Sequence, residues 1–302
     1  MLKVAFDKSY KHPLDENHRF PMIKYDLIPE QLLRENTCNH ENFFSPSLLE
    51  DNLALLTHCE YYYKRFSSLL LSKKEIRPIG FPMSRELVYR EKKIAKGTIE
   101  CVDFSIKNGI SMNIAGGTHH AFRDRGEAFC MLNDQAIAAN YLLENNKANK
   151  ILIVDLDVHQ GNGNSDIFKD NKNVFTFSMH SKSNYPAKKS ISDCDVELKD
   201  NTEDKEYLNI LKFHLNKLNK ENFDFVFYIA GVDIHFNDRL GKLKISDDGV
   251  KKRDEIVTEN FFSKRIPLCG VLGGGYNKDS KKLVELHSYL HQSCAKLVSS
   301  YE

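Results

Sequence analysis

The second half of the sequence alternates between short continuous apolar runs and longer segments with helical periodicity. The apolar runs begin near residue 110 and are GISMNIAGG, KILIVDLDVH, NVFTFSMH, FDFVFYIAGVDI and IPLCGVLGGGY. The segments between them include NDQAIAANYLLENN, EDKEYLNILKFHLNKLNKEN and SDDGVKKRDEIVTENFFSKR. Continuous apolar strands are buried on both faces, which is typical of a parallel sheet covered by helices. The pattern predicts one α/β domain over residues 1–302, with a mostly parallel central sheet.

Polar residues follow most of the apolar runs, and this places the expected chemistry at one edge of the sheet. In folds of this class, binding sites form in the loops that follow the carboxyl ends of the strands. The amino-terminal part is richer in helix signals, such as SPSLLEDNLALLTHCEYYYKRF at residues 45–66. Residues after Met1 alternate in polarity and predict a first strand instead of a signal peptide.

Charge and cysteine content exclude several classes of protein. There are 43 basic and 42 acidic residues, a net charge of +1, so nothing indicates a nucleic-acid-binding surface. No apolar run reaches membrane-spanning length, and no membrane partner is expected. The seven cysteines occur without a CxxC pair, which argues against a disulfide framework or a thiolate zinc site. We therefore expect a reducing, cytoplasmic location.

The strongest chemical signal is ILIVDLDVHQGNG at residues 151–163. Asp155, Asp157 and His159 alternate with apolar residues, so all three can leave the strand on one side. Two carboxylates and an imidazole at a buried strand end repel or stay poorly solvated without a cation. The alternative is a set of helix-capping and turn residues. Burial of acids in a turn carries a large desolvation penalty, which argues against that alternative.

A second source of ligands follows the strand FYIAGVDI, where the loop contains Asp233 and Asp238. An aspartate in a loop usually caps a helix or a turn. These two are candidate metal ligands only because the DxDxH segment follows a companion strand. Two aspartates and one histidine would leave a fourth position open, which is the catalytic arrangement of zinc. The same ligands suit Fe²⁺ or another divalent metal, so the metal stays open.

Two further segments join these at the sheet edge. His119 and His120 are adjacent after a glycine pair, and only an irregular turn can direct both at one place. Three glycines, 273–275, permit unusual backbone angles and close approach by a ligand before Tyr276. Taken alone, that last motif is equally well a flexible turn with an exposed tyrosine.

In this order, the motifs resemble the histone deacetylase family, which has the arginase–deacetylase fold with a sheet of about eight strands. The resemblance extends from HPLDENHRFPM to LGGGY, and DVHQGNG with NTEDKEYL is most similar to the class IV branch and its bacterial relatives. It implies that Asp157, His159 and Asp238 bind zinc and that Asp233 has a supporting role. It further implies that the enzyme removes acetyl or longer fatty acyl groups from lysine side chains by metal-activated water.

The resemblance also assigns catalytic roles. Asp155 would support His119, whereas the position facing His120 is the amide Asn162. A neutral partner raises a histidine pKa less than a carboxylate does, so we expect His120 as general base and His119 as the more cationic member. Tyr276 would donate a hydrogen bond to the oxyanion.

By the same resemblance, an acyl-lysine tunnel and a potassium site are expected. The tunnel residues would be Gly117, Ala128, Phe129, Tyr185 and Ile245, and Ala128 stands where the family commonly has glycine. Arg19 would lie at the foot of the site, near an acetate exit or an acyl cavity. The potassium ligands would be Asp155, Asp157, His159, Ser178 and Met179.

Other functions compete with this prediction. Two classes of substrate are compatible with the motifs: an acyl-lysine protein or peptide, and a small acylated amine such as a polyamine. A catalytically silent, deacetylase-like binding module is a third hypothesis, against which the intact Asp157, His159, Asp238 and Tyr276 argue. A binuclear, arginase-like enzyme is less favoured because additional bridging acids are not evident.

Overall fold

The computed structural model describes residues 1–300, and its centre is an eight-stranded sheet in which every neighbouring pair of strands is parallel. The spatial order is β2-β1-β3-β8-β7-β4-β5-β6. The strands are β1 (Lys3–Ala5), β2 (Phe43–Phe44), β3 (Ile110–Asn113), β4 (Ile151–Asp155), β5 (Val174–Ser181), β6 (Cys194–Leu198), β7 (Phe225–Ile229) and β8 (Leu268–Val271). The predicted parallel α/β architecture is confirmed.

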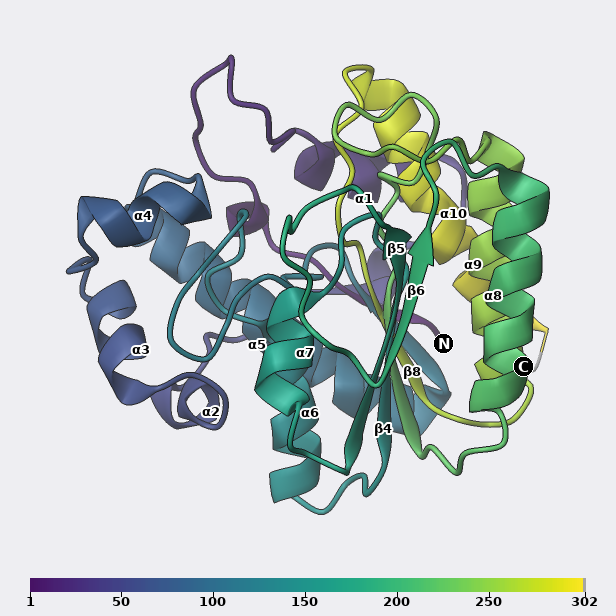
Figure 1. Cartoon of the computed structure of the whole chain (residues 1–302), viewed down its shortest axis with the longest axis horizontal. Helices are drawn as coiled ribbons and strands as arrows, with labels where there is room; N and C mark the ends of the chain where they lie inside the picture. The colour runs from purple at the N-terminus through teal and green to yellow at the C-terminus, as the bar shows by residue number, and fades with distance from the viewer. Residues whose placement is uncertain (301–302) are drawn as a thin grey trace.

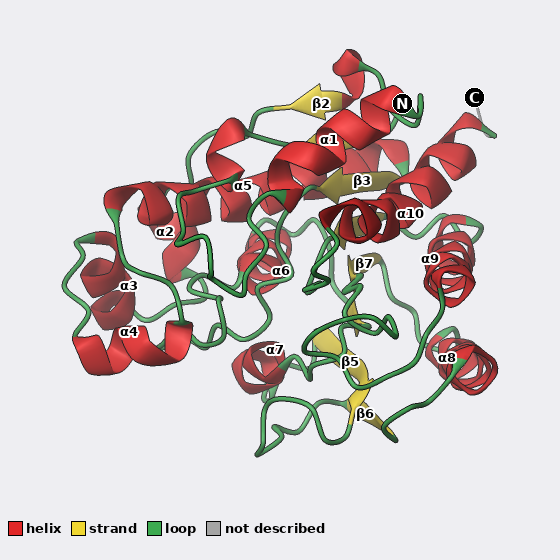
Figure 2. Ribbon diagram, turned by 90° about the horizontal axis from the view of Figure 1, so that it is seen from above, coloured by secondary structure: helices red, strands yellow, loops and turns green. Residues whose placement is uncertain are grey.

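Helices cover both faces of this sheet (Figure 2). On one face lie α5 (Arg85–Asn108), α6 (Asp134–Glu144) and α7 (Asn162–Phe168). On the other face lie α8 (Asp204–Leu218), α9 (Asp247–Phe262) and α10 (Ser280–Ser299), with α1 (Lys24–Arg34) packed against α10. The short helices α2 (Asp51–Leu55), α3 (Glu60–Ser67) and α4 (Lys73–Ile79) form a lobe beyond α5 (Figure 1).

Burial along the strands matches the sequence pattern. All five residues of β4 and all five of β7 are buried, as expected for central strands that are covered on both faces. The edge strand β6 instead carries a mixed sequence, CDVEL, with exposed acids. Apolar burial at the centre therefore fixes which strands lie inside, because each buried aliphatic or aromatic side chain contributes about 1.5–3 kcal/mol.

The helical segment at residues 45–66 is interrupted. It forms α2 and α3, which are separated by residues 56–59, and the N–H of Cys59 donates to the carbonyl of Arg123 in the histidine-pair loop. The longest helix, α5, is capped at its start by Ser84, whose hydroxyl accepts from the N–H of Leu87, and at its end by Gly109, with φ of 88°. These capping interactions set the helix bounds.

Four adjacent strands, β3, β8, β7 and β4, end at one edge of the sheet. The segments that follow them contain the histidine pair, the three glycines, the aspartate loop and the DxDxH motif, respectively. All seven cysteines are free. Within residues 1–300 there is no helix with the length and apolarity needed to cross a bilayer.

Candidate active site

The DxDxH segment leaves the end of β4 and is almost completely buried. Asp155 is the last residue of β4, and its Oδ1 accepts from the N–H of Asp157 at 3.2 Å. Asp157 is 1% exposed and His159 is 8% exposed. The Oδ1 of Asp157 accepts from the N–H of His159 at 2.9 Å, and the same oxygen lies 2.9 Å from His159 Nδ1. The motif is therefore folded onto itself in a tight turn that gathers its polar side chains.

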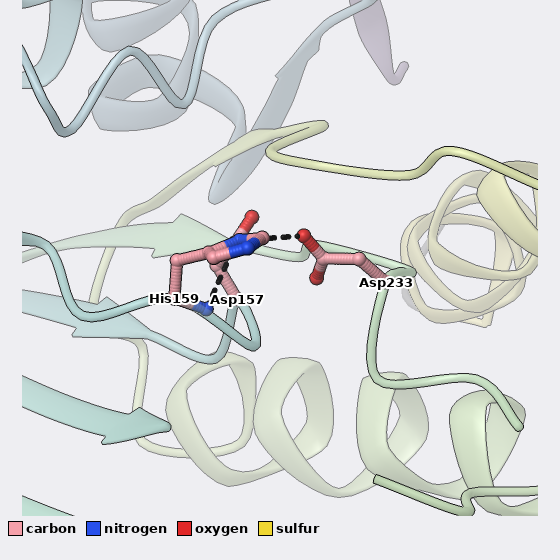
Figure 3. Close-up of side chains that lie close together, drawn as sticks. All are labelled: Asp157, His159 and Asp233. Atoms are coloured by element: carbon pink, nitrogen blue, oxygen red, sulfur yellow. Dashed lines mark hydrogen bonds and ion pairs between the residues drawn. The ribbon is translucent and has the colours of Figure 1, made fainter. Parts of the chain in front are cut away.

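The third member of this group is Asp233, from the loop after β7. Its Oδ2 lies 3.1 Å from His159 Nδ1, and its Oδ1 accepts from the N–H of Val158 at 2.9 Å. Figure 3 shows the imidazole of His159 between the carboxylates of Asp157 and Asp233. One ligand atom from each residue lies within 4.8 Å of the other two, so the three can hold a single metal ion.

Asp238, which the sequence predicts as the third ligand, lies in the same loop, and its carboxylate accepts hydrogen bonds from the backbone. Its Oδ1 accepts from the N–H groups of Leu240 and Gly241, at 2.8 and 3.1 Å. Its Oδ2 accepts from the N–H of Tyr276 at 2.6 Å. The chain has already turned between Asp233 and Asp238, so Asp238 ties its own loop to the glycine loop. The role of Asp238 as a zinc ligand stays a prediction, as does the supporting role expected for Asp233.

The donor set at Asp157, His159 and Asp233 fits a divalent cation. Burial and the negative charge of Asp157 raise the pKa of Asp233 to about 7, which shows how poorly the two carboxylates tolerate each other as anions. Burial lowers the pKa of His159, but hydrogen bonds to Asp157 and Asp233 outweigh it and raise that pKa to about 10. A bound cation would satisfy both carboxylates. Two oxygens and one nitrogen would leave a fourth coordination position free.

The histidine pair lies in a turn after β3, and the two rings are 4.1 Å apart between centroids. His119 Nδ1 donates to Asp155 Oδ2 at 2.6 Å, and His120 Nδ1 donates to Asn162 Oδ1 at 2.6 Å. Each ring therefore turns its Nε2 away from its partner. The contacts expected for this pair from the sequence are present in the structure.

These partners give the two histidines opposite electrostatics. Burial opposes the charged form of His119, but the carboxylates of Asp155 and Asp157 outweigh burial and raise its pKa to about 9. Burial also lowers the pKa of His120, and the charges of His119 and His159 lower it well below its usual range. His119 is therefore the cationic member and His120 the neutral one.

Tyr276 reaches the site from the glycine loop after β8. The N–H of Gly274 donates to Asp157 Oδ2 at 2.6 Å, and a Cβ on Gly274 would lie only 2.1 Å from Asp233 Oδ2. Glycine is therefore required for this close approach. The Tyr276 ring lies 6.3 Å from that of His159. Burial raises the pKa of Tyr276 well above its usual value, so the hydroxyl stays protonated and can donate.

An outer channel of 260 Å³ leads from the surface to this group. Its wall includes the expected residues Ala128, Phe129 and Tyr185, and Tyr185 packs edge-on against His120 with ring centroids 5.0 Å apart. The Tyr185 hydroxyl donates to Glu127 Oε2 at 2.5 Å, which fixes the ring at the rim. Three lining residues were not predicted: Pro78, Asn184 and Leu240.

Ile245, expected in this wall, lies elsewhere. It is fully buried, and its backbone pairs with Ile234 and Phe236, N–H to carbonyl, at 3.2 and 3.0 Å. Its side chain faces Gly249 at the start of α9 instead of the channel. Leu240, which follows Asp238 closely in the chain, occupies the wall. Its place depends on the turn held by Asp238, for which the apolar pattern gives no signal.

Ala128 and Phe129 have an unusual backbone, with φ of 44° and 67°. This left-handed region favours glycine, which explains why an alanine at position 128 is notable. The segment is held against the end of α4, because the N–H groups of Ala128 and Phe129 donate to the carbonyls of Pro78 and Ile79 at 2.9 and 2.7 Å. These two bonds help to keep the Phe129 ring in the channel wall.

Beyond the histidines and Tyr276 lies an inner cavity with a volume of about 40 Å³ for water-sized groups. Gly117, expected near the substrate, lines it together with Tyr25, Arg90 and Ile94. Gly117 is also where the loops after β3 and β8 touch, since a Cβ there would lie 2.5 Å from Gly273.

Arg19 is not at the foot of the site as expected, because it lines the outer channel. The buried cations on the inner side are Arg90 and Lys24. Lys24 Nζ has no hydrogen-bond partner within residues 1–300, and burial lowers its pKa to about 8 although Asp233 opposes that shift. Sequence analysis missed both cations because each lies on a helix of mixed polarity, where a basic residue usually faces solvent.

The residues expected to bind potassium lie on two paired strands and the turn after β4. Ser178 is the register partner of Asp155 in the β4–β5 ladder, and Met179 follows it, fully buried. The Ser178 hydroxyl is 2.9 Å from His180 Nδ1. Occupation of this place by potassium stays a prediction.

Comparison with known proteins gives consistent matches. Residues 18–289 match the family model of the histone deacetylase domain. An uncharacterized protein of Picosynechococcus is 41% identical over 96% of this chain and 97% of its own length. Histone deacetylase 2 of Arabidopsis thaliana is 30% identical over 90% of this chain and 73% of its own. The crystal structure of a histone deacetylase homologue from Aquifex aeolicus has a TM-score of 0.82 at 22% identity, covering 99% of this chain and 84% of that one.

Proposed function

Since the chain belongs to the histone deacetylase family, we propose that it is a zinc-dependent hydrolase that removes acetyl groups from lysine side chains. The observation that carries the proposal is the convergence of Asp157, His159 and Asp233 at the inner end of the outer channel, beside His120 and Tyr276. When bound there, a zinc ion would polarise the amide carbonyl and lower the pKa of a water ligand towards about 7.

The two histidines divide the proton transfers between them in this proposal. His120 Nδ1–H is committed to Asn162, so the neutral ring has a free lone pair at Nε2 and accepts the proton of the attacking water. His119 holds a proton at both nitrogens, because Asp155 stabilises its cation, and its Nε2–H can stabilise negative charge or protonate the leaving amine. The pH–rate profiles of His119→Ala and His120→Ala test this, and equal losses with unshifted profiles would contradict it.

The channel walls suit an acylated lysine. Phe129, Tyr185 and Leu240 offer apolar surface to the butyl chain at low entropic cost. In this proposal the Tyr276 hydroxyl donates to the oxygen of the tetrahedral species, which is supported by the place of Tyr276 in the cavity wall and by its raised pKa, which keeps that donor protonated at neutral pH.

The inner cavity supports a short acyl group. A cavity needs about 10–15 Å³ on this measure for each water molecule, so 40 Å³ accommodates about three water-sized groups. That space is comparable in size to the two carbons and the oxygen of an acetyl group. We therefore propose acetyl-lysine as the preferred substrate over a long-chain acyl-lysine.

One experiment tests the function and the acyl length together. The protein is purified, its bound metal is quantified, and hydrolysis of acetyl-lysine and myristoyl-lysine peptides of the same sequence is compared. We expect about one zinc ion per chain and faster turnover of the acetyl peptide. A protein that binds zinc but cleaves neither peptide would contradict the proposed reaction, whereas preference for the myristoyl peptide would contradict only the acyl length.

A further inference from the structure

Arg19 places an unpaired positive charge at the mouth of the outer channel. Among the side chains that line this channel it is the sole arginine, lysine or carboxylate. Its guanidinium carbon lies 4.9 Å from the centroid of the Phe129 ring, so it stands over the aromatic wall of the channel. The side chain is exposed.

The segment that carries Arg19 is anchored on both sides of it. His18 Nε2 lies 2.9 Å from the carbonyl oxygen of Gly80, and the N–H of Phe20 donates to His18 Nδ1 at 3.1 Å. The Phe20 ring packs against Phe129 with centroids 5.1 Å apart. The backbone at Arg19 is therefore held beside the channel. Binding of a ligand to its guanidinium then costs little conformational entropy of the backbone.

Within residues 1–300, no carboxylate or carbonyl accepts from the Arg19 guanidinium. The nearby acid at the rim, Glu127, is already engaged by Arg125 Nε at 2.8 Å and by the Tyr185 hydroxyl at 2.5 Å. The rim thus offers planar, charged hydrogen-bond donors to the substrate and no free carboxylate from the channel wall. A guanidinium in this state is matched to a carboxylate, which it can bind through two parallel hydrogen bonds.

We propose that Arg19 determines substrate specificity by binding a carboxylate that lies next to the acylated lysine. This inference rests on the proposed deacetylase function and names its preferred substrates, which are acetyl-lysines flanked by an acidic residue or bearing a free α-carboxylate. The positive charge of Arg19 also disfavours polyamines as substrates, because it would repel their additional ammonium groups at the rim.

The test uses acetyl-lysine peptides that differ in a single flanking charge. One pair carries Glu or Gln before the acetyl-lysine, a second pair carries Glu or Gln after it, and a third pair ends in acetyl-lysine as a free acid or an amide. For wild type we expect kcat/KM about three- to tenfold higher for the acidic member of at least one pair, mainly through KM. The pair that responds identifies the source of the carboxylate.

Arg19→Gln should bring that acidic-to-neutral ratio close to one, and Arg19→Lys should retain part of it, because lysine keeps the charge but not the planar fork. The control is Arg34→Gln, an exposed arginine on α1 that does not line the channel and should leave the ratio unchanged. Turnover by wild type without any charge preference would overturn this inference alone. Failure of wild type to hydrolyse any of the six peptides would overturn the proposed function and this inference with it.

Discussion

At the scale of single residues, the two aspartates of the loop after β7 show that hydrogen-bond partners decide the role of a side chain. Asp233 shares His159 with Asp157, whereas Asp238 accepts from three backbone N–H groups. Both are aspartates five positions apart in one loop, and residue type does not distinguish them. The first can bind a cation, and the second holds the loop that carries Leu240 next to the glycine loop.

This difference predicts how the two aspartates respond to the same substitution. Asp233→Asn should lower zinc affinity strongly, because it removes a charged ligand from a set of three. Asp238→Asn should retain zinc and lose stability, since an amide oxygen is a weaker acceptor for the three N–H groups. Zinc titration of both variants by calorimetry measures the effect. Tighter zinc binding by Asp233→Asn than by Asp238→Asn would contradict this assignment and favour Asp238 as the ligand.

Tyr276 allows a second prediction at this scale. Tyr276→Phe removes one hydroxyl and should reduce kcat by about 10²–10³, the usual cost of losing one oxyanion donor. The ring packing against Phe20 and Phe129 remains, so zinc content and thermal stability should stay close to wild type. Near-normal turnover of an acetyl-lysine peptide would show that another group stabilises the oxyanion.

At the scale of elements, α9 supports the loop that presents Asp233. Arg253, on α9, is completely buried and donates to the carbonyls of Gly231 and Ala230, just after β7. Its charge is balanced by Asp254, with Nη2 2.9 Å from Oδ1, and Asp254 also accepts from the Tyr228 hydroxyl at 2.6 Å. Both members of this buried ion pair lie on α9, and their hydrogen bonds to Gly231, Ala230 and Tyr228 join the helix to the end of β7 next to the site.

Breaking that pair on one side should be costly. We expect Arg253→Leu to lower the free energy of unfolding by about 3–5 kcal/mol, because the Asp254 carboxylate is left buried without its cation. The control is Lys169→Ala, which removes an exposed pair with Asp166 and should cost less than about 1 kcal/mol. Urea unfolding of both variants gives the comparison, and similar values for the two would refute the supporting role of Arg253.

At the scale of the whole molecule, the site exists because four strands that are distant in sequence end side by side. β3, β8, β7 and β4 are neighbours in the sheet, and each contributes one loop to the group around His159. No single loop contains the three side chains that could hold a metal ion, since Asp157 and Asp233 follow different strands. Binding of a metal therefore stabilises the native arrangement of the sheet edge and not one loop alone.

Metal removal should accordingly lower the thermal stability of the whole chain. Zinc at one hundred times its dissociation constant stabilises the folded state by about 2.7 kcal/mol, which corresponds to an unfolding temperature higher by several degrees. Scanning calorimetry with zinc and with a chelator measures this difference. It should largely disappear in Asp233→Asn and persist in Lys169→Ala. Equal unfolding temperatures for wild type under both conditions would argue against a metal centre.

The strands, the helices and most of the polar residues at the sheet edge could be predicted from the amino-acid sequence. Continuous apolar runs specify central parallel strands, because such strands are buried on both faces. The polar residues that directly follow a strand, including the DxDxH motif and the histidine pair, are close to its end, so the fold leaves them little freedom. The expected contacts of His119 with Asp155 and of His120 with Asn162 are present in the structure.

Residues further along the loops or within helices reach their places through long-range packing, which the sequence pattern does not show. The place of Leu240 in the channel wall, where Ile245 was expected, depends on a turn held by a long-range hydrogen bond to the glycine loop. The place of Arg19 at the rim, and of Lys24 and Arg90 inside, depends on how the amino-terminal helices dock onto the sheet. Local periodicity does not indicate such docking, because the residues that pack together are distant in the chain and meet only in the folded molecule.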